Sequence, residues 1–330
     1  MYYKAPMNIL FEIKKWWRWL RIKGFKAIFW TSSHVNYRNY MVLASIIIGI
    51  GAGLAAVILK YAVHTIGQWL YGNDPTSGRL GFVFFPIIGV TLAVLFYKYL
   101  LKKPLNLGFP PLINRISRKK VNLPPNEMYA HVVSGSLTVG FGGSVGLEAP
   151  IVRTGASIGS NIARILQVGR NKQTLFLACG AAAGMAAIFN SPVAAVIFAF
   201  EVLLTDFALH AFIPLLISAA TGAVVAKLLY YKKLFYLPEG DWSFESLPFY
   251  ILLGIFAGLL STYMIRINLG IQNYVAKFEK SVYKILFGGL SIGALIFLLP
   301  PLFGEGYETV NQLLTGQFRS ITEHSLFYAF

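Results

Sequence analysis

The chain has 330 residues, of which 56% are hydrophobic and 13% are charged, and its mean hydropathy is +0.61. An average soluble domain carries roughly 25% charged residues, so this composition argues against a soluble globule and favours a polytopic α-helical membrane protein. The single cysteine, Cys179, can form neither an internal disulfide nor a cysteine-rich metal site, and the net charge of +16 has to be interpreted from where the basic residues lie.

Residues 1–40 carry an excess of basic side chains ahead of the first long apolar stretch. Glu12 is the only acidic residue among eight basic ones, which are Lys4, Lys14, Lys15, Arg18, Arg21, Lys23, Lys26 and Arg38. The positive-inside rule therefore places the N-terminus in the cytoplasm. Aromatic and aliphatic residues alternate with these charges from Ile9 to Trp30, which predicts an amphipathic helix at the cytoplasmic interface. An arm that binds nucleic acid is the weaker alternative, and we expect no nucleic-acid partner.

Five apolar stretches are long enough to cross roughly 30 Å of hydrocarbon. They are Met41–Val63, Leu80–Leu101, Ala211–Tyr231, Phe249–Ile267 and Ile285–Leu302. The segment Leu105–Phe207 is also apolar, but Gly, Pro and polar residues interrupt it, so several short or broken helices are expected there. Irregular backbone at membrane depth persists only where protein buries it or where it lines a wet cavity, so we expect the functional site in this segment. Three polar segments predict loops: Tyr71–Arg79, Arg115–Glu127 and Lys232–Ser246.

The segment Phe141–Gly159 (FGGSVGLEAPIVRTGASIG) combines a glycine-rich loop with the start of a helix. Its glycines permit positive φ, and Pro150 lies where a first helical turn begins. The N–H groups of such a turn and the positive end of the helix dipole suit an anion. Glu148 precedes the proline by two residues and can itself occupy the anion site until protonation releases it. Equally, Glu148 can be a carboxylate that caps the helix N-terminus.

Two further stretches place turn-forming residues next to an expected helix start. Asn106–Pro111 (NLGFPP) predicts the start of a short helix, and Gly184–Glu201 predicts two short helices separated at Asn190-Ser191-Pro192. Glu201 is an intramembrane or interfacial acid, which is either functional or bonded to freed backbone groups, and the structural interpretation is favoured.

Bond-making chemistry has little support in the sequence. The five histidines lie far apart, and no nucleophile elbow or nucleotide-binding loop is present. An integral-membrane enzyme acting on an anionic lipid would have Ser144, Asp206 and His210 as candidates by residue type alone, without catalytic spacing. We therefore predict that the protein is not an enzyme and has no cofactor or metal.

The chain resembles the CLC family of chloride channels and proton-coupled chloride transporters. Gly146–Ser160 is similar to the family's G-[KR]-E-G-P motif with Glu148 in the place of the gating glutamate, and NLGFPP resembles the G-S-G-x-P motif. Ala183–Glu201 and Gly304–Val310 (GEGYETV) resemble later elements in the same order. The resemblance implies an inverted repeat of broken, tilted helices, divided here into 41–205 and 206–330, and a homodimer in a lipid membrane with one anion path per subunit.

On this resemblance, the residues that line the anion path surround two helix starts, with Glu148 as the gate. They are Gly146, Ala149 and Pro150 at one start and Leu107, Gly108, Phe109 and Pro110 at the other.

Four departures from the family pattern modify this expectation. Leu107 replaces the serine that coordinates the central anion, Ala149 replaces a glycine, and Val202 stands where proton-coupled members tend to have a second glutamate. The later GxFxP helix start has no counterpart before Phe330, so the second repeat is expected to be incomplete at the C-terminus. We predict a channel-like chloride pathway in the plasma (inner) membrane, with a proton-coupled antiporter as the alternative.

Overall fold

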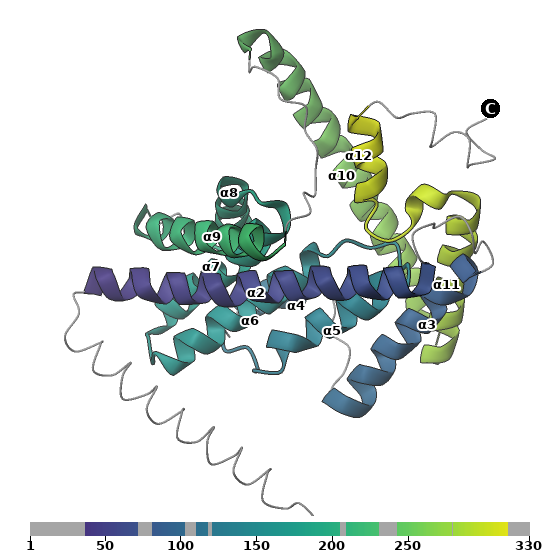
Figure 1. Ribbon diagram of the computed structural model, residues 1–330, viewed down its shortest axis with the longest axis horizontal. Coiled ribbons are helices and arrows are strands. Elements are labelled where there is room, and N and C mark those ends of the chain that lie inside the picture. Colours follow the sequence, from purple (N-terminus) through teal and green to yellow (C-terminus); the bar gives the residue numbers. More distant parts are fainter. Residues whose placement is uncertain are drawn as a thin grey trace, which may run out of the picture. The chain divides into compact units, whose positions relative to one another are not determined.

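The computed structural model describes residues 37–71, 81–102, 110–117, 121–204, 209–230, 243–278 and 280–315. Every regular element within these ranges is a helix, so the predicted all-α class is confirmed (Figure 1). The chain divides into two compact units, each assembled from separate stretches of sequence. The first unit comprises Met1–Tyr61, Lys103–Ser134 and Leu147–Tyr231, and the second comprises Ala62–Lys102, Gly135–Gly146 and Lys232–Phe330.

The first unit is built on small residues that let helix backbones approach closely. Its helices are α4 (Pro110–Ser117), α6 (Glu148–Ile165), α7 (Arg170–Phe189), α8 (Pro192–Val202), α9 (Leu209–Leu229) and the start of both α2 (Tyr37–Tyr71) and α5 (Glu127–Gly140). A β-carbon on Gly180 of α7 would collide with the carbonyl group of Gly155 on α6. Gly222 of α9 similarly faces the Ala183 carbonyl of α7, with 2.5 Å between that oxygen and an added β-carbon. Close packing of this kind is typical of helices in lipid.

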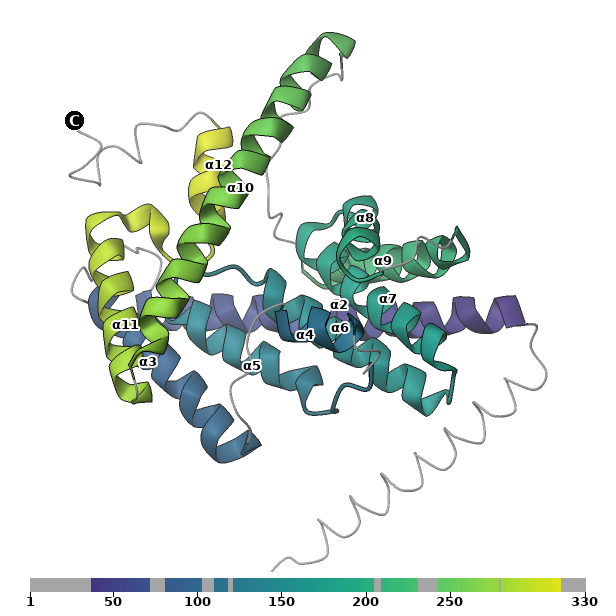
Figure 2. The same ribbon diagram turned by 180° about the vertical axis from the view of Figure 1, so that it is seen from behind.

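The second unit holds α3 (Gly81–Leu95), α10 (Leu247–Ala276), α11 (Ser281–Leu298) and α12 (Tyr307–Leu314). It also contains the π-helix η1 (Phe96–Leu101) and the short 3₁₀ helices η2 (Phe244–Ser246) and η3 (Pro300–Leu302). Helices α3 and α11 lie side by side in Figure 1 and Figure 2, where Gly289 and Gly293 of α11 meet Ile87 and Val83 of α3. No residue of α10 is buried.

The expected membrane spans are largely confirmed. Four of the five coincide with helices long and apolar enough to cross a membrane, at Asn39–Leu70, Val83–Leu101, Ala211–Leu229 and Phe244–Ala276. The stretch expected at 285–302 corresponds to the shorter apolar helix Val282–Leu298. The prediction of only short or broken helices in 105–207 is wrong for α7, because its 20 residues form a fifth helix of spanning length.

The α7 helix was missed because its surroundings differ from those of a lipid-facing helix. Leu175–Gly184 is buried without interruption, and much of it is alanine and glycine. A helix surrounded by protein needs small side chains for packing, so its sequence looks less apolar than that of a helix exposed to lipid.

The predicted loops and N-terminal helix are only partly covered by the described residues. Arg115, Ile116 and Ser117 belong to α4 and not to a loop, so the boundary predicted at Arg115 is wrong. The other two loops, except for their ends, and the helix expected at Ile9–Trp30 lie outside the described residues. The division of the chain into repeats at 41–205 and 206–330 stays a prediction.

Candidate functional site

The first turn of α6 places Glu148 at the start of a helix, as the sequence predicted. Leu147 is the N-cap residue and is buried, whereas Glu148, Ala149 and Pro150 are half-buried. The first backbone bond of the helix runs from the Ile151 N–H to the Leu147 carbonyl at 3.1 Å. The N–H groups of a first helical turn have no acceptor within their own helix, and groups of this kind can bind an anion.

The structure places Glu148 one residue after the N-cap position, and its role as gate or as helix-terminal carboxylate stays a prediction. Glu148 is the first helical residue, and the N-cap position before it belongs to Leu147, whose side chain makes no capping hydrogen bond. A carboxylate in a first helical turn still lies in the favourable field of the helix dipole. Ala149 is part of the helix, so the replacement of glycine by alanine requires no unusual backbone conformation there.

A glycine loop ends α5 and leads to this helix start. Gly142 has a φ of +86°, and the amides of Gly142 and Gly143 donate to the carbonyls of Val139 and Thr138 at 2.8 and 2.9 Å. A side chain at Gly143 would come within 2.6 Å of the Thr138 oxygen, so only glycine fits. The loop ends at Gly146, which is half-buried.

A second glycine turn contacts this loop within the second unit. The Val145 N–H donates to the Gly304 carbonyl at 3.2 Å, and Gly304 and Gly306 have φ values of +64° and +75°. Gly306 is the N-cap residue of α12. The GEGYETV element therefore reaches the loop that precedes α6 and begins a helix of its own.

The other predicted helix start is described only from Pro110 onward. Pro110 is the first residue of α4, which confirms the short helix expected at NLGFPP. Leu107, Gly108 and Phe109 lie outside the described residues. Their roles stay predictions, as does the effect of Leu107 on anion preference.

The predicted break between α7 and α8 is confirmed. Asn190 ends α7 with a φ of +53°, and Pro192 begins α8. Glu201, near the end of α8, has an exposed side chain, and its structural or functional role stays a prediction. Val202 is half-buried.

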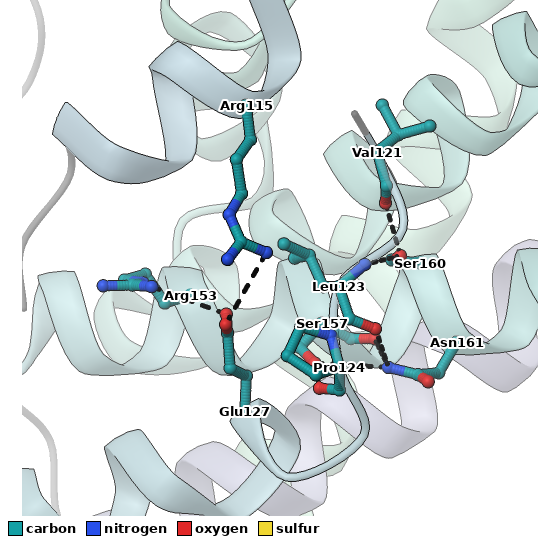
Figure 3. Close-up of polar contacts among 9 residues, drawn as sticks. All are labelled: Arg115, Val121, Leu123, Pro124, Glu127, Arg153, Ser157, Ser160 and Asn161. Carbon is teal, nitrogen blue, oxygen red and sulfur yellow. Dashed lines mark hydrogen bonds and ion pairs between the residues drawn. The ribbon is translucent and has the colours of Figure 1, made fainter. Parts of the chain in front are cut away.

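A polar row on α6 connects this helix to the start of α5 and to the segment before it (Figure 3). The Arg153 Nη2 lies 3.4 Å from the Glu127 Oε2, and the Arg115 Nη1 lies 3.8 Å from the Glu127 Oε1. The Arg153 side chain is only 4% exposed and that of Glu127 15%, whereas Arg115 is 39% exposed. Glu127 therefore joins three helices, α4, α5 and α6, through one carboxylate.

The same face of α6 holds the connection between α4 and α5. The Ser160 hydroxyl donates to the Val121 carbonyl at 2.6 Å and accepts from the Leu123 N–H at 2.9 Å. The neighbouring Asn161 amide donates to the Leu123 carbonyl at 3.3 Å, and the Ser157 hydroxyl, about one turn earlier, donates to the Pro124 carbonyl at 3.3 Å. These bonds satisfy backbone groups of a non-helical segment, which have no partners in a helix of their own.

Sequence reasoning missed four charged residues that contact other helices: Lys60, Arg115, Glu127 and Arg153. Lys60 and Arg153 each interrupt an apolar or small-residue stretch, and a charge in such a place is itself a signal of function. Their partners come from other parts of the chain, so the pairing is not visible in sequence. Of the residues considered for an enzyme, Ser144 is exposed and Asp206 lies outside the described residues.

The chain is similar to a protein family and to curated proteins that are all described as chloride channels. The family model described as "Voltage gated chloride channel" matches residues 89–330. A ClcB-like chloride channel protein of Ralstonia nicotianae is 28% identical over 286 residues, covering 81% of this chain and 66% of its own length. The chloride channel protein CLC-e of Arabidopsis thaliana is 26% identical over 303 residues (83% and 42%). The voltage-gated ClC-type chloride channel ClcB of Escherichia coli is 30% identical over 183 residues (54% and 44%).

Solved structures share the fold. A slow cyanobacterial Cl⁻/H⁺ antiporter superposes with a TM-score of 0.69 at 23% identity, covering 84% of this chain and 68% of that one. A CLC-type fluoride/proton antiporter gives a TM-score of 0.71 at 24% identity, covering 86% and 72%. The chain spans less than two thirds of the length of each of the three curated relatives above.

Proposed function

We propose, because the chain belongs to the CLC family of voltage-gated chloride channels, that it forms a gated pathway for chloride or a related anion across a membrane. Family membership and the long apolar helices make it an integral, multi-pass membrane protein. The observation that carries the proposal is the first turn of α6, where Glu148 follows a glycine loop at a helix N-terminus.

In this proposal, an anion and the Glu148 carboxylate compete for the same helix start. The N–H groups around Gly146, Ala149 and the start of α6 would bind either one, and Pro150 would hold the first turn in helical form. Protonation neutralises the Glu148 carboxylate, and rotation moves it away from the helix start, so either change admits the anion. This arrangement attracts an anion without a full positive charge, so the anion is not held too tightly to leave.

The second part of the pathway is proposed at the start of α4, with Leu107, Gly108, Phe109 and Pro110 as lining residues. Leu107 has no hydroxyl, so backbone groups would do the coordinating there and anion preference would differ from that of serine-bearing relatives. We propose further that the protein is a homodimer in a lipid bilayer, with its N-terminus in the cytoplasm and the plasma (inner) membrane as its site.

Anion flux from liposomes that contain the full-length protein tests the gate. We expect Glu148→Ala to give faster chloride flux that no longer depends on pH, because the competing carboxylate is gone. In the unmodified protein, flux should rise as pH falls, since protonation neutralises the carboxylate. Glu245→Ala, which removes an exposed carboxylate at the start of η2, serves as the matched control. Unchanged rate and pH dependence in Glu148→Ala would refute the gating role.

A further inference from the structure

Lys60 places an ammonium group at the end of α7. Lys60 lies within the apolar span Asn39–Leu70 and is half-buried. Its Nζ donates to the carbonyl oxygens of Ala187 at 3.1 Å and Ile188 at 2.8 Å. Both carbonyls belong to the last turn of α7. The carbonyl groups of a last helical turn receive no hydrogen bond from an N–H group of their own helix. A charged side chain in a membrane span costs free energy, so its position calls for a functional explanation.

Aromatic residues fix the position of this lysine. The Lys60 Nζ lies 5.2 Å from the centre of the Tyr230 ring, within the range of a cation–π contact. The neighbouring Tyr61 donates its hydroxyl to the Leu229 carbonyl at 2.9 Å and meets Tyr230 edge to face, with ring centres 5.1 Å apart. The end of α9 therefore holds this part of α2 against the end of α7.

The end of α7 lies level with the start of α6. Three close backbone approaches define the register of these helices: Gly159 with Phe176, Gly155 with Gly180, and Ile151 with Gly184. From one pair to the next, the residue number falls along α6 and rises by the same amount along α7, so the two helices are antiparallel. One further step of the same size sets Leu147 level with Ile188, whose carbonyl accepts from Lys60.

This arrangement creates an electrostatic conflict that a positive charge resolves. The start of a helix carries roughly half a positive elementary charge and its end roughly half a negative one. The negative end of α7 therefore lies beside the positive start of α6 and weakens its attraction for an anion. A lysine ammonium bound to the last carbonyls of α7 offsets that negative end.

We propose that Lys60 is a positioning residue of the anion pathway, which neutralises the end of α7 and so keeps the start of α6 attractive to anions. This inference rests on the proposed function of the α6 start. Lys60 acts through α7 and need not touch the anion. Its role is electrostatic, so it affects the affinity for chloride more than the stability of the fold.

Chloride binding to the purified full-length protein, measured by isothermal titration calorimetry, tests this role without requiring flux. Lys60→Met should weaken chloride binding about two- to fivefold, the effect of one charge at a helix end. Lys60→Arg keeps the charge and should retain most of the affinity. Lys227→Met removes an exposed lysine from the last turn of α9 in the same unit and should leave binding unchanged.

The liposome assay supplies the second readout. We expect Lys60→Met to raise the chloride concentration at half-maximal flux, whereas a purely structural cap would lower the thermal transition of the protein and leave that concentration unchanged. If Lys60→Met does not fold, Lys60→Gln, which keeps an amide donor without the charge, decides by the same titration. Affinity equal to that of the unmodified protein in a folded variant overturns the inference alone. Absence of chloride binding and flux in the unmodified protein overturns the proposed function.

Discussion

Glu127 forms an ion pair with the buried side chain of Arg153. Removing one partner of a buried ion pair costs about 3–5 kcal/mol, whereas an exposed pair contributes about 0–1 kcal/mol. We therefore expect Glu127→Ala to lower the apparent Tm of the detergent-solubilised protein strongly, and Arg115→Ala only slightly, because Arg115 is 39% exposed and 3.8 Å from the carboxylate. Arg164→Ala, which removes an exposed arginine bonded to Asn161, is the control on the same helix. An equal loss in Arg115→Ala and Glu127→Ala would contradict this ranking.

At the scale of single residues, features that depend on the local sequence were predictable, whereas the contact partners of charged side chains were not. Glu148 and Pro150 in a first helical turn follow from glycine, proline and dipole rules that act within a few residues. The pairing of Arg153 with Glu127, or of Lys60 with the last carbonyls of α7, joins residues far apart in sequence. Only the packed helices show which charge meets which partner.

The contact between α6 and α7 depends on glycines that leave no room for a β-carbon. A side chain at Gly180 would meet the backbone of Gly155, which cannot move aside as a flexible side chain can. Because overpacking costs about 1–3 kcal/mol or more, Gly180→Ala should strongly reduce folded yield and apparent Tm. Gly67→Ala in α2 meets nothing within 4 Å and should be neutral or slightly stabilising, since alanine favours helix. Size-exclusion chromatography and thermal unfolding compare the two, and a tolerated Gly180→Ala would show that the helices can separate.

Element boundaries divide into those set locally and those set by packing. The break between α7 and α8 was predictable because Asn190 takes a left-handed conformation and Pro192 suits a first helical turn. The length of α7 was not, because its small residues are apolar enough only when other helices surround them. Likewise Ser157, Ser160 and Asn161 make α6 look too polar for a membrane helix, although they satisfy the backbone of Val121–Pro124.

At the scale of the whole molecule, composition predicted the all-α class and hydropathy located most spans. The grouping into two units was not predictable, because each unit combines three separate stretches of chain. Helix α2 contributes to both units, with Tyr61 in the first and Ala62 in the second, and α5 is divided after Ser134 in the same way. The hydrophobic periodicity of a helix does not show which distant helix packs against each part of it.

Proton coupling, a property of the whole protein, distinguishes a channel-like chloride pathway from a proton-coupled antiporter. Two solved structures with this fold are proton antiporters, but at 23% and 24% identity they establish the fold and not the coupling. Val202 cannot carry a proton where a second glutamate would, so we expect a chloride gradient to drive no stoichiometric proton uptake into liposomes containing the full-length protein. A pH-sensitive dye inside the vesicles measures this while chloride flux is recorded in parallel. Val202→Glu is the matched variant, since a restored carboxylate should increase proton movement per chloride. Robust proton uptake by the unmodified protein would instead establish the antiporter. A group other than Val202 would then carry the proton on the inner side, and Glu201→Gln would be the first variant to test.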